Sequence, residues 1–243
     1  MSNIKNAFSK GKAFIPFITC GQISLDITEK TIYEMEKNGA NLIELGIPFS
    51  DPVAEGSIIQ SANNRALKNG TTTDKIFSML ESVRKNTDIP MVFMTYANIV
   101  FSYGIERFAE KSKELKMDGI ILPDVPYEEK KEFDSIFKKY DIDFISLIAP
   151  TSEERISAIA KDSNGFIYCV SSLGVTGIRE NINTNIEKMV NLVKSVNNIP
   201  VAVGFGISTP KQAKEMSKYA DGVIVGSAIV KLCEEYGEDS PSY

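Results

Sequence analysis

The chain alternates short apolar runs with longer segments in which apolar residues recur every three or four positions. The short runs are rich in Val, Ile, Leu, Met and Phe and are bounded by Gly, Pro, Asp or Asn, as expected of strands buried on both faces of a parallel sheet. The pattern predicts eight strands, at residues 13–19, 42–45, 90–96, 118–122, 144–148, 165–171, 200–203 and 222–225. The segments between them have helical spacing.

A short leading helix is predicted within residues 1–11. Longer helices are predicted between Ser24 and Gly39, at 58–67, from Thr73, at 104–115, at 128–140, from Thr151, at 184–196, at 210–219 and from Ser227. Ser24 is a good N-cap residue. Thr151 with Glu154 three positions later has the spacing of a capping box.

This alternation of strands and helices is typical of repeated βα units around a parallel sheet. Eight units in one chain predict a single (β/α)8 TIM barrel over residues 1–243, with the short N-terminal helix plugging one end. An open doubly wound sheet is the alternative fold. Such a sheet usually has a Gly-rich phosphate turn after its first strand, which this sequence lacks.

The composition is that of an ordinary globular protein. The 243 residues are 43% hydrophobic and 24% charged, and a length of about 250 is typical of such a barrel. The net charge of −5 argues against nucleic-acid binding, which needs clustered Lys and Arg. No apolar run approaches the ~20 residues that span a bilayer, and residues 1–12 lack a signal-peptide core, so we expect a cytoplasmic protein with no membrane contact.

The sequence contains no His, which excludes His-based triads and the usual zinc sites. Chemistry is therefore left to carboxylates, Tyr, Lys, Ser and Thr. Cys20, Cys169 and Cys233 are odd in number and form no Cys-x-x-Cys pattern, so they are predicted to be buried or free thiols.

The stretch from Asn41 to Asn63 holds the strongest candidate chemistry. Glu44 lies inside a buried apolar run, where burial disfavours the charged carboxylate and raises its pKa, as a general acid/base near neutral pH requires. Residues 46–57 form a long irregular connection that carries Asp51 and Glu55 nearby. A strand-end carboxylate facing water, or a structural ion pair, remains an alternative for Glu44.

Glycine clusters follow the last three strands, at 174–177, 204–208 and 226–227. In barrels the loops after strands seven and eight often form a phosphate site, because glycines let backbone N–H groups approach an anion at a helix N-terminus. Any one cluster could instead serve only a tight turn. The three together predict a phosphorylated substrate.

The run from Glu44 to Pro52, followed by Ala54, Glu55, Gly56 and Gln60, resembles the signature of the tryptophan synthase alpha chain family. Residues 94–98 and 122–126 extend the resemblance, which covers essentially the whole chain. It implies the cleavage of indole-3-glycerol phosphate to indole and glyceraldehyde 3-phosphate, a step of tryptophan biosynthesis.

The resemblance also implies roles for individual residues. Glu44 would be the acid/base, Glu55 would stabilise positive charge at the indole nitrogen, and Thr176 would orient Glu55. The substrate phosphate would be held by Gly177, Gly206, Gly226 and Ser227, and the rest of the substrate would be surrounded by Phe17, Tyr96, Tyr168, Phe205 and Ile224.

No metal or cofactor is implied in this chain. A pyridoxal-phosphate-dependent beta chain is the implied partner, in an alpha2-beta2 heterotetramer, with Asp51, Pro52 and Asp124 at the contact.

The sequence departs from the family pattern at three places in the barrel loops. Glu55 stands where the family usually has Asp, Ser57 where it has Pro, and Gln22-Ile23 where it has Asp-Pro. Only residues 228–243 follow Ser227, so we expect a shorter last helix or a less covered seam. Two other functions remain open: another phospho-sugar barrel, such as an isomerase or a thiamin-type synthase, and a catalytically silent barrel that regulates a partner.

Overall fold

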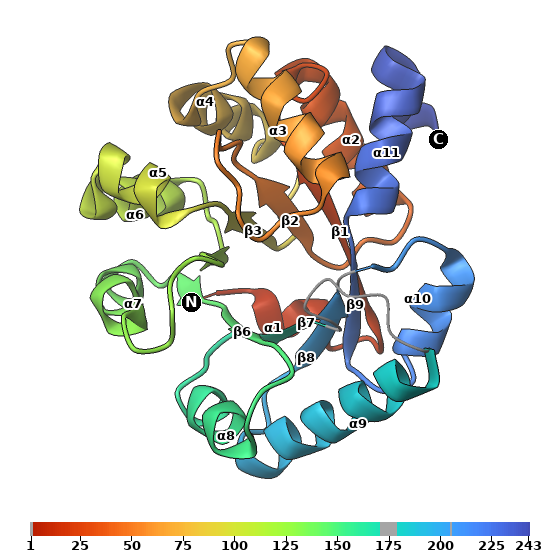
Figure 1. The fold of residues 1–243 in the computed structure, drawn as a ribbon. Coiled ribbons are helices and arrows are strands. Elements are labelled where there is room, and N and C mark those ends of the chain that lie inside the picture. Colours follow the sequence, from red (N-terminus) through yellow and green to blue (C-terminus); the bar gives the residue numbers. More distant parts are fainter. Residues whose placement is uncertain (1, 171–178, 205) are drawn as a thin grey trace.

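A computed structural model describes residues 2–170, 179–204 and 206–243. Its strands form one ring, with helices around the outside (Figure 1). The strands are β1 (Ala13–Thr19), β2 (Ile43–Gly46), β3 (Met91–Met94), β4 (Gly119–Ile121), β5 (Asp143–Phe144), β6 (Ser146–Ile148), β7 (Ile167–Val170), β8 (Val201–Gly204) and β9 (Gly222–Val225).

All neighbouring strands are parallel, in the order β5-β4-β3-β2-β1-β9-β8-β7-β6. The two ends of this order, β5 and β6, are separated in the chain only by Ile145, so the ring returns to its start. The predicted (β/α)8 barrel is therefore confirmed. The predicted fifth strand, 144–148, is divided at Ile145, because β5 pairs with β4 whereas β6 pairs with β7.

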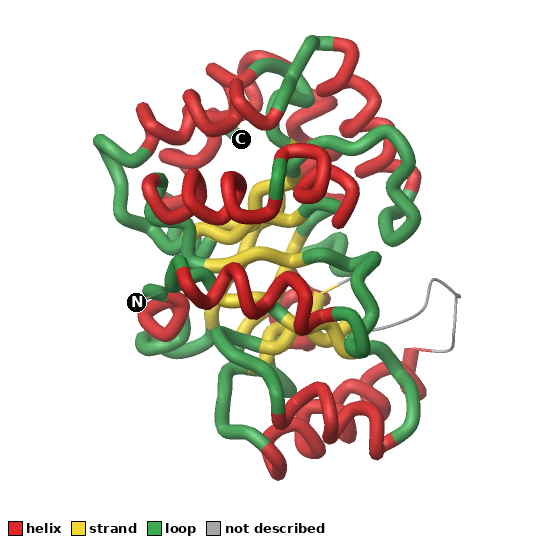
Figure 2. The backbone as a smooth tube through the Cα atoms, turned by 90° about the vertical axis from the view of Figure 1, so that its left-hand side faces the viewer, coloured by secondary structure: helices red, strands yellow, loops and turns green. Residues whose placement is uncertain are grey.

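The helices lie outside the strands, which Figure 2 shows gathered at the centre. They are α2 (Leu25–Lys37), α3 (Ser57–Lys68), α4 (Thr73–Val83), α5 (Ala97–Tyr103), α6 (Ile105–Glu114), α7 (Lys130–Lys139), α8 (Glu153–Lys161), α9 (Arg179–Val196), α10 (Pro210–Met216) and α11 (Ser227–Tyr236), with a 3-10 helix η1 (Gly237–Ser242). None of the helices in the described parts of the chain is long and apolar enough to cross a membrane.

Three helix predictions need correction. Helix α5 was not predicted, and Gly104, with a φ of +91°, separates it from α6. Helix α9 begins at Arg179, five residues before the predicted start. The N-cap of α8 is Ser152 and not Thr151, because the Ser152 hydroxyl accepts the hydrogen bond from the Arg155 backbone N–H at 3.3 Å.

The barrel interior is filled by one cluster of buried side chains. Ile4 and Ala7 of α1 (Ile4–Ala7) join residues from the strands in this cluster, so α1 closes one end of the barrel as predicted. Leu42 and Val92 belong to the same cluster. Because side chains alternate along a strand, Glu44 lies on the interior side with Leu42, one layer toward the carboxyl ends of the strands.

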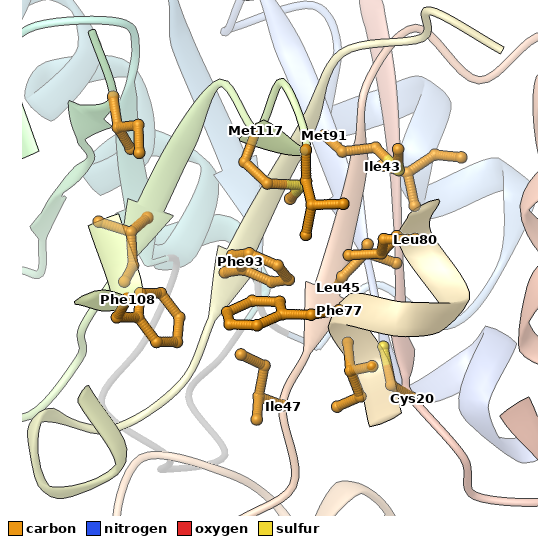
Figure 3. Packing of buried hydrophobic residues seen from close by; sticks show 14 of the residues in the cluster. Cys20, Ile43, Leu45, Ile47, Phe77, Leu80, Met91, Phe93, Phe108 and Met117 are labelled. Atoms are coloured by element: carbon orange, nitrogen blue, oxygen red, sulfur yellow. The ribbon is translucent and has the colours of Figure 1, made fainter. Parts of the chain in front are cut away.

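A second layer of core lies between the strands and the outer helices (Figure 3). Phe77 of α4 packs edge-on against Phe108 of α6, with ring centroids 5.3 Å apart, and Phe93 of β3 joins both rings. Ile43 and Leu45 of β2 belong to this layer and hold the strand from outside. Glu44 is thus fixed between two apolar layers. The three cysteines are buried and free, which confirms that prediction.

Candidate active site

Glu44 lies inside the barrel near the carboxyl ends of the strands. Its residue is 1% exposed, and its strand neighbours in register are Phe17 of β1 and Val92 of β3. Burial raises the pKa of the Glu44 carboxyl to about 8, and the charge of Glu55 adds to the rise. Its Oε2 has no hydrogen-bond partner within the described residues. The predicted increase in pKa is present, and one carboxyl oxygen is left without a hydrogen-bond partner among the described residues.

Glu55 is on the connection between β2 and α3, which is irregular as predicted. Helix α3 begins two residues later, and Gln60 from its first turns donates to the Glu55 backbone carbonyl at 2.8 Å. The side-chain amide of Asn63 donates to Glu55 Oε2 at 2.6 Å. Burial raises the pKa of Glu55 to about 7, and hydrogen bonds from Asn63 and Tyr96 oppose that rise.

Tyr96 joins the third strand to this connection. It follows β3, is the N-cap residue of α5, and is 2% exposed. Its hydroxyl accepts the Ala54 backbone N–H at 3.1 Å, and it lowers the pKa of the Glu55 carboxyl. Its ring stacks on Phe49, with centroids 4.9 Å apart and an angle of 29° between the planes. Two elements distant in sequence therefore meet at Glu55.

Glycines at the strand ends leave room for aromatic side chains inside the barrel. A Cβ atom on Gly204 would lie 2.6 Å from the Tyr168 hydroxyl oxygen, and one on Gly46 would lie 2.7 Å from the Phe17 ring. Burial raises the pKa of Tyr168, and the charge of Glu44 adds to the effect. Ile224 packs in the same interior cluster as Tyr168.

The predicted phosphate glycines are described only in part. Gly226 is the N-cap of α11 and Ser227 is its first residue, so both lie at a helix N-terminus, where backbone N–H groups favour anions. Gly206 is exposed, with a φ of +73° and open space where a Cβ would be. Thr176, Gly177 and Phe205 lie outside the described residues.

The predicted partner-contact residues lie on two loops at the carboxyl ends of the strands. Asp51 is exposed and Pro52 half-buried, and the neighbouring Val53 is 81% exposed. Asp124 is also exposed, and both its carboxylate oxygens accept the backbone N–H of Ala97, the first residue of α5, at 3.1 Å. Asp124 thus holds the start of the helix that Tyr96 caps.

Asn63 is the site residue that the sequence analysis missed. It is 3% exposed on α3, one helical turn from Ile59 and next to the buried Ala62. A polar residue at an apolar position of a helix was the available signal, because a buried amide needs a hydrogen-bond partner. In the described parts of the chain there is no group of three or more acidic or Cys side chains that could hold a metal ion.

Comparison with known proteins identifies the family. The sequence profile described as tryptophan synthase alpha chain matches residues 3–242. The tryptophan synthase alpha chain of Lacticaseibacillus casei is 46% identical over 242 residues, which cover 100% of this chain and 91% of the relative. The chain belongs to the tryptophan synthase alpha chain family. It is therefore a member of a family of lyases of tryptophan biosynthesis, as the resemblance implied.

Solved structures of tryptophan synthase share the barrel. The alpha subunit from Campylobacter jejuni superposes with a TM-score of 0.90 at 33% identity, covering 99% of this chain and 96% of that one. A chain from a structure of the tryptophan synthase a2b2 complex of Pyrococcus furiosus has a TM-score of 0.87 at 36% identity, covering 96% and 94%. The alternative that the chain belongs to another phospho-sugar barrel family is wrong.

Proposed function

We propose that this chain cleaves indole-3-glycerol phosphate to indole and glyceraldehyde 3-phosphate. The observation that carries the proposal is the pair of coupled carboxyls, Glu44 and Glu55, at the carboxyl end of the barrel of a tryptophan synthase alpha chain. The buried aromatic and aliphatic residues Phe17, Tyr168 and Ile224, which the resemblance places around the substrate, suit a flat apolar indole ring.

Glu44 is suited to move protons in both directions. With a pKa of about 8 it is mostly protonated at neutral pH, so it can donate a proton to the indole ring carbon as the carbon–carbon bond breaks. The carboxylate formed can then take the proton from the glycerol hydroxyl, which becomes the aldehyde. Indole gains one proton and the glycerol moiety loses one, so Glu44 ends the reaction in its starting state.

Glu55 serves the same reaction as an anion. Protonation of the ring carbon places positive charge on the indole nitrogen, and a nearby carboxylate stabilises that charge. Burial raises the pKa of both carboxyls, and the hydrogen bonds that oppose this rise go to Glu55, so Glu55 is the group that ionises while Glu44 keeps its proton. Turnover should therefore fall on the acid side as Glu55 is protonated and on the alkaline side as Glu44 loses its proton.

The phosphate site and the partner are further parts of the proposal. The substrate phosphate is held by Gly177, Gly206, Gly226 and Ser227, and Thr176 orients Glu55. The Pyrococcus furiosus relative is an a2b2 complex. A beta chain with pyridoxal phosphate accordingly binds this chain at Asp51, Pro52 and Asp124, and this chain itself uses no cofactor.

Release of indole from indole-3-glycerol phosphate tests the reaction. The purified chain should release indole, and Glu44→Gln should lower turnover by at least ~100-fold with little change in KM, because Gln keeps the shape but transfers no proton. Glu55→Ala should also lower turnover severely. The exposed Glu81→Gln on α4 is the control. No indole from the unmodified chain, or near-normal turnover of Glu44→Gln, contradicts the proposal.

A further inference from the structure

The amide of Asn63 has an unusual place for a polar side chain. It belongs to the buried face of α3, where Ala62 and Ala66 are fully buried, yet it reaches Glu55 Oε2 at 2.6 Å. The next residue, Asn64, is exposed on the same helix. A buried amide that donates to a carboxylate forms a charge-assisted hydrogen bond, which is about twice as strong as a neutral one.

A second donor approaches the same carboxylate from another strand. The Tyr96 hydroxyl accepts the Ala54 N–H at 3.1 Å, which holds the backbone next to Glu55, and as a donor to Glu55 it lowers the pKa of that carboxyl. The Glu55 backbone carbonyl is held separately by Gln60 at 2.8 Å. The carboxylate position is therefore determined by contacts from both α3 and the end of β3.

We propose that Asn63 is a positioning residue that, together with the Tyr96 hydroxyl, keeps the Glu55 carboxylate ionised and fixed at the barrel mouth. The proposal rests on the proposed function, in which Glu55 must be an anion to stabilise the indole cation. Burial favours the neutral acid, and donors to the carboxylate favour the anion. Without Asn63 the balance moves to the neutral acid.

The ionisable groups around Glu55 strengthen this need. In the described parts of the chain, the ionisable groups that interact electrostatically with Glu55 are Glu44 on β2 and Tyr96. Tyr96 in turn interacts with the charge of Asp124. All of these groups are neutral or negative, so none can stabilise the Glu55 anion by opposite charge. The hydrogen bonds from Asn63 and Tyr96 carry that stabilisation. Loss of the Glu55 charge would in addition lower the pKa of Glu44.

The direct test titrates Glu55 without using activity. In a Glu44→Gln background, in which Glu55 titrates without its coupled neighbour, the carbon-13 signal of the Glu55 carboxyl is followed against pH. Adding Asn63→Ala should raise the Glu55 pKa by about one unit, the size expected for one hydrogen bond to a charged group. Adding Tyr96→Phe, which keeps the ring stacked on Phe49, should raise it also.

Matched controls separate positioning from general damage. Asn64→Ala, on the exposed face of α3, should leave the Glu55 pKa unchanged, as should Tyr103→Phe, whose hydroxyl bonds Asp74. In the otherwise unmodified enzyme, Asn63→Ala should move the acid limb of the kcat/KM profile to higher pH. An unchanged Glu55 pKa in both folded variants overturns the inference. A shifted pKa in a chain that releases no indole instead overturns the proposed function.

Discussion

The carboxylates of Glu44 and Glu55 would repel each other if both were charged, and this repulsion sets the chemistry of the site. Each is partly or wholly buried, so each has a raised pKa, and the charge on Glu55 raises that of Glu44 further. Two interacting carboxyls titrate as a pair, with one proton held more tightly than the other. The hydrogen bonds from Asn63 and Tyr96 go to Glu55, so Glu44 is the group that keeps the proton.

The buried Glu44 carboxyl should make stability depend on pH. Its pKa is about 8 in the folded chain and 4.5 at its ordinary value. Between these values the unfolded chain loses the proton that the folded chain keeps, so the free energy of unfolding falls as pH rises and the full loss is reached above pH 8. Each unit of difference is worth about 1.4 kcal/mol.

The Gln side chain of the Glu44→Gln variant does not titrate, so this variant should not lose stability in this way as pH rises. We expect the free energy of unfolding of Glu44→Gln, relative to the unmodified chain, to rise by a few kcal/mol between pH 5 and pH 9. Urea denaturation at the two pH values measures it. Glu81→Gln, which changes an exposed carboxyl, should show no such rise. A relative stability of Glu44→Gln that is equal at pH 5 and pH 9 would contradict the buried, protonated state of Glu44.

Most elements could be predicted from periodicity, and the failures have physical causes. The division at Ile145 depends on which neighbour each half of the strand pairs with, which no local pattern contains. Helix α5 has the sequence Ala-Asn-Ile-Val-Phe-Ser-Tyr, whose β-branched and aromatic residues are weak helix formers. Its first N–H is bound by Asp124 from another loop, a tertiary contact that the sequence does not reveal.

In the candidate site, too, the sequence predicts local features but not tertiary contacts. The burial of Glu44 followed from the apolar residues beside it in sequence, and the irregular connection to Glu55 from its prolines. The contacts of Asn63 and Tyr96 with Glu55 join α3 and the end of β3, so they depend on how the barrel closes. Thr176, Gly177 and Phe205 stay predictions, because they lie outside the described residues.

The cap of α8 provides a test at the scale of one element. Ser152→Ala should lower the free energy of unfolding by about 1 kcal/mol, because the Arg155 N–H loses its acceptor at the helix start. Thr151→Ala, one residue earlier and exposed, should change stability much less. Urea denaturation compares the two variants. A larger loss for Thr151→Ala would restore the capping box expected from the sequence and contradict the structure.

At the scale of the whole molecule, the loops proposed to carry the catalytic carboxylate are also the loops proposed to contact the partner. The connection that carries Glu55 exposes Asp51 and Val53, and the loop of Asp124 holds the helix that begins after Tyr96. Binding at this face would therefore act on the same segments that place Glu55. Because mobile catalytic loops are often ordered by binding, we expect the proposed beta chain to increase turnover of indole-3-glycerol phosphate.

Val53 allows that expectation to be tested without altering the catalytic groups. Its side chain is 81% exposed, so Val53→Glu should leave stability and the turnover of the isolated chain unchanged. At the partner contact the new carboxylate would lose water without gaining a counter-charge, so beta-chain affinity should fall by about tenfold or more, and stimulation with it. Val196→Glu, at a 40% exposed position on α9, is the matched control and should bind normally. Titration of turnover with beta chain measures both affinities.

Two outcomes would contradict these expectations. Unchanged turnover at saturating beta chain would show that the partner does not act through these loops. Equal affinities of the two variants would place the contact elsewhere on the barrel.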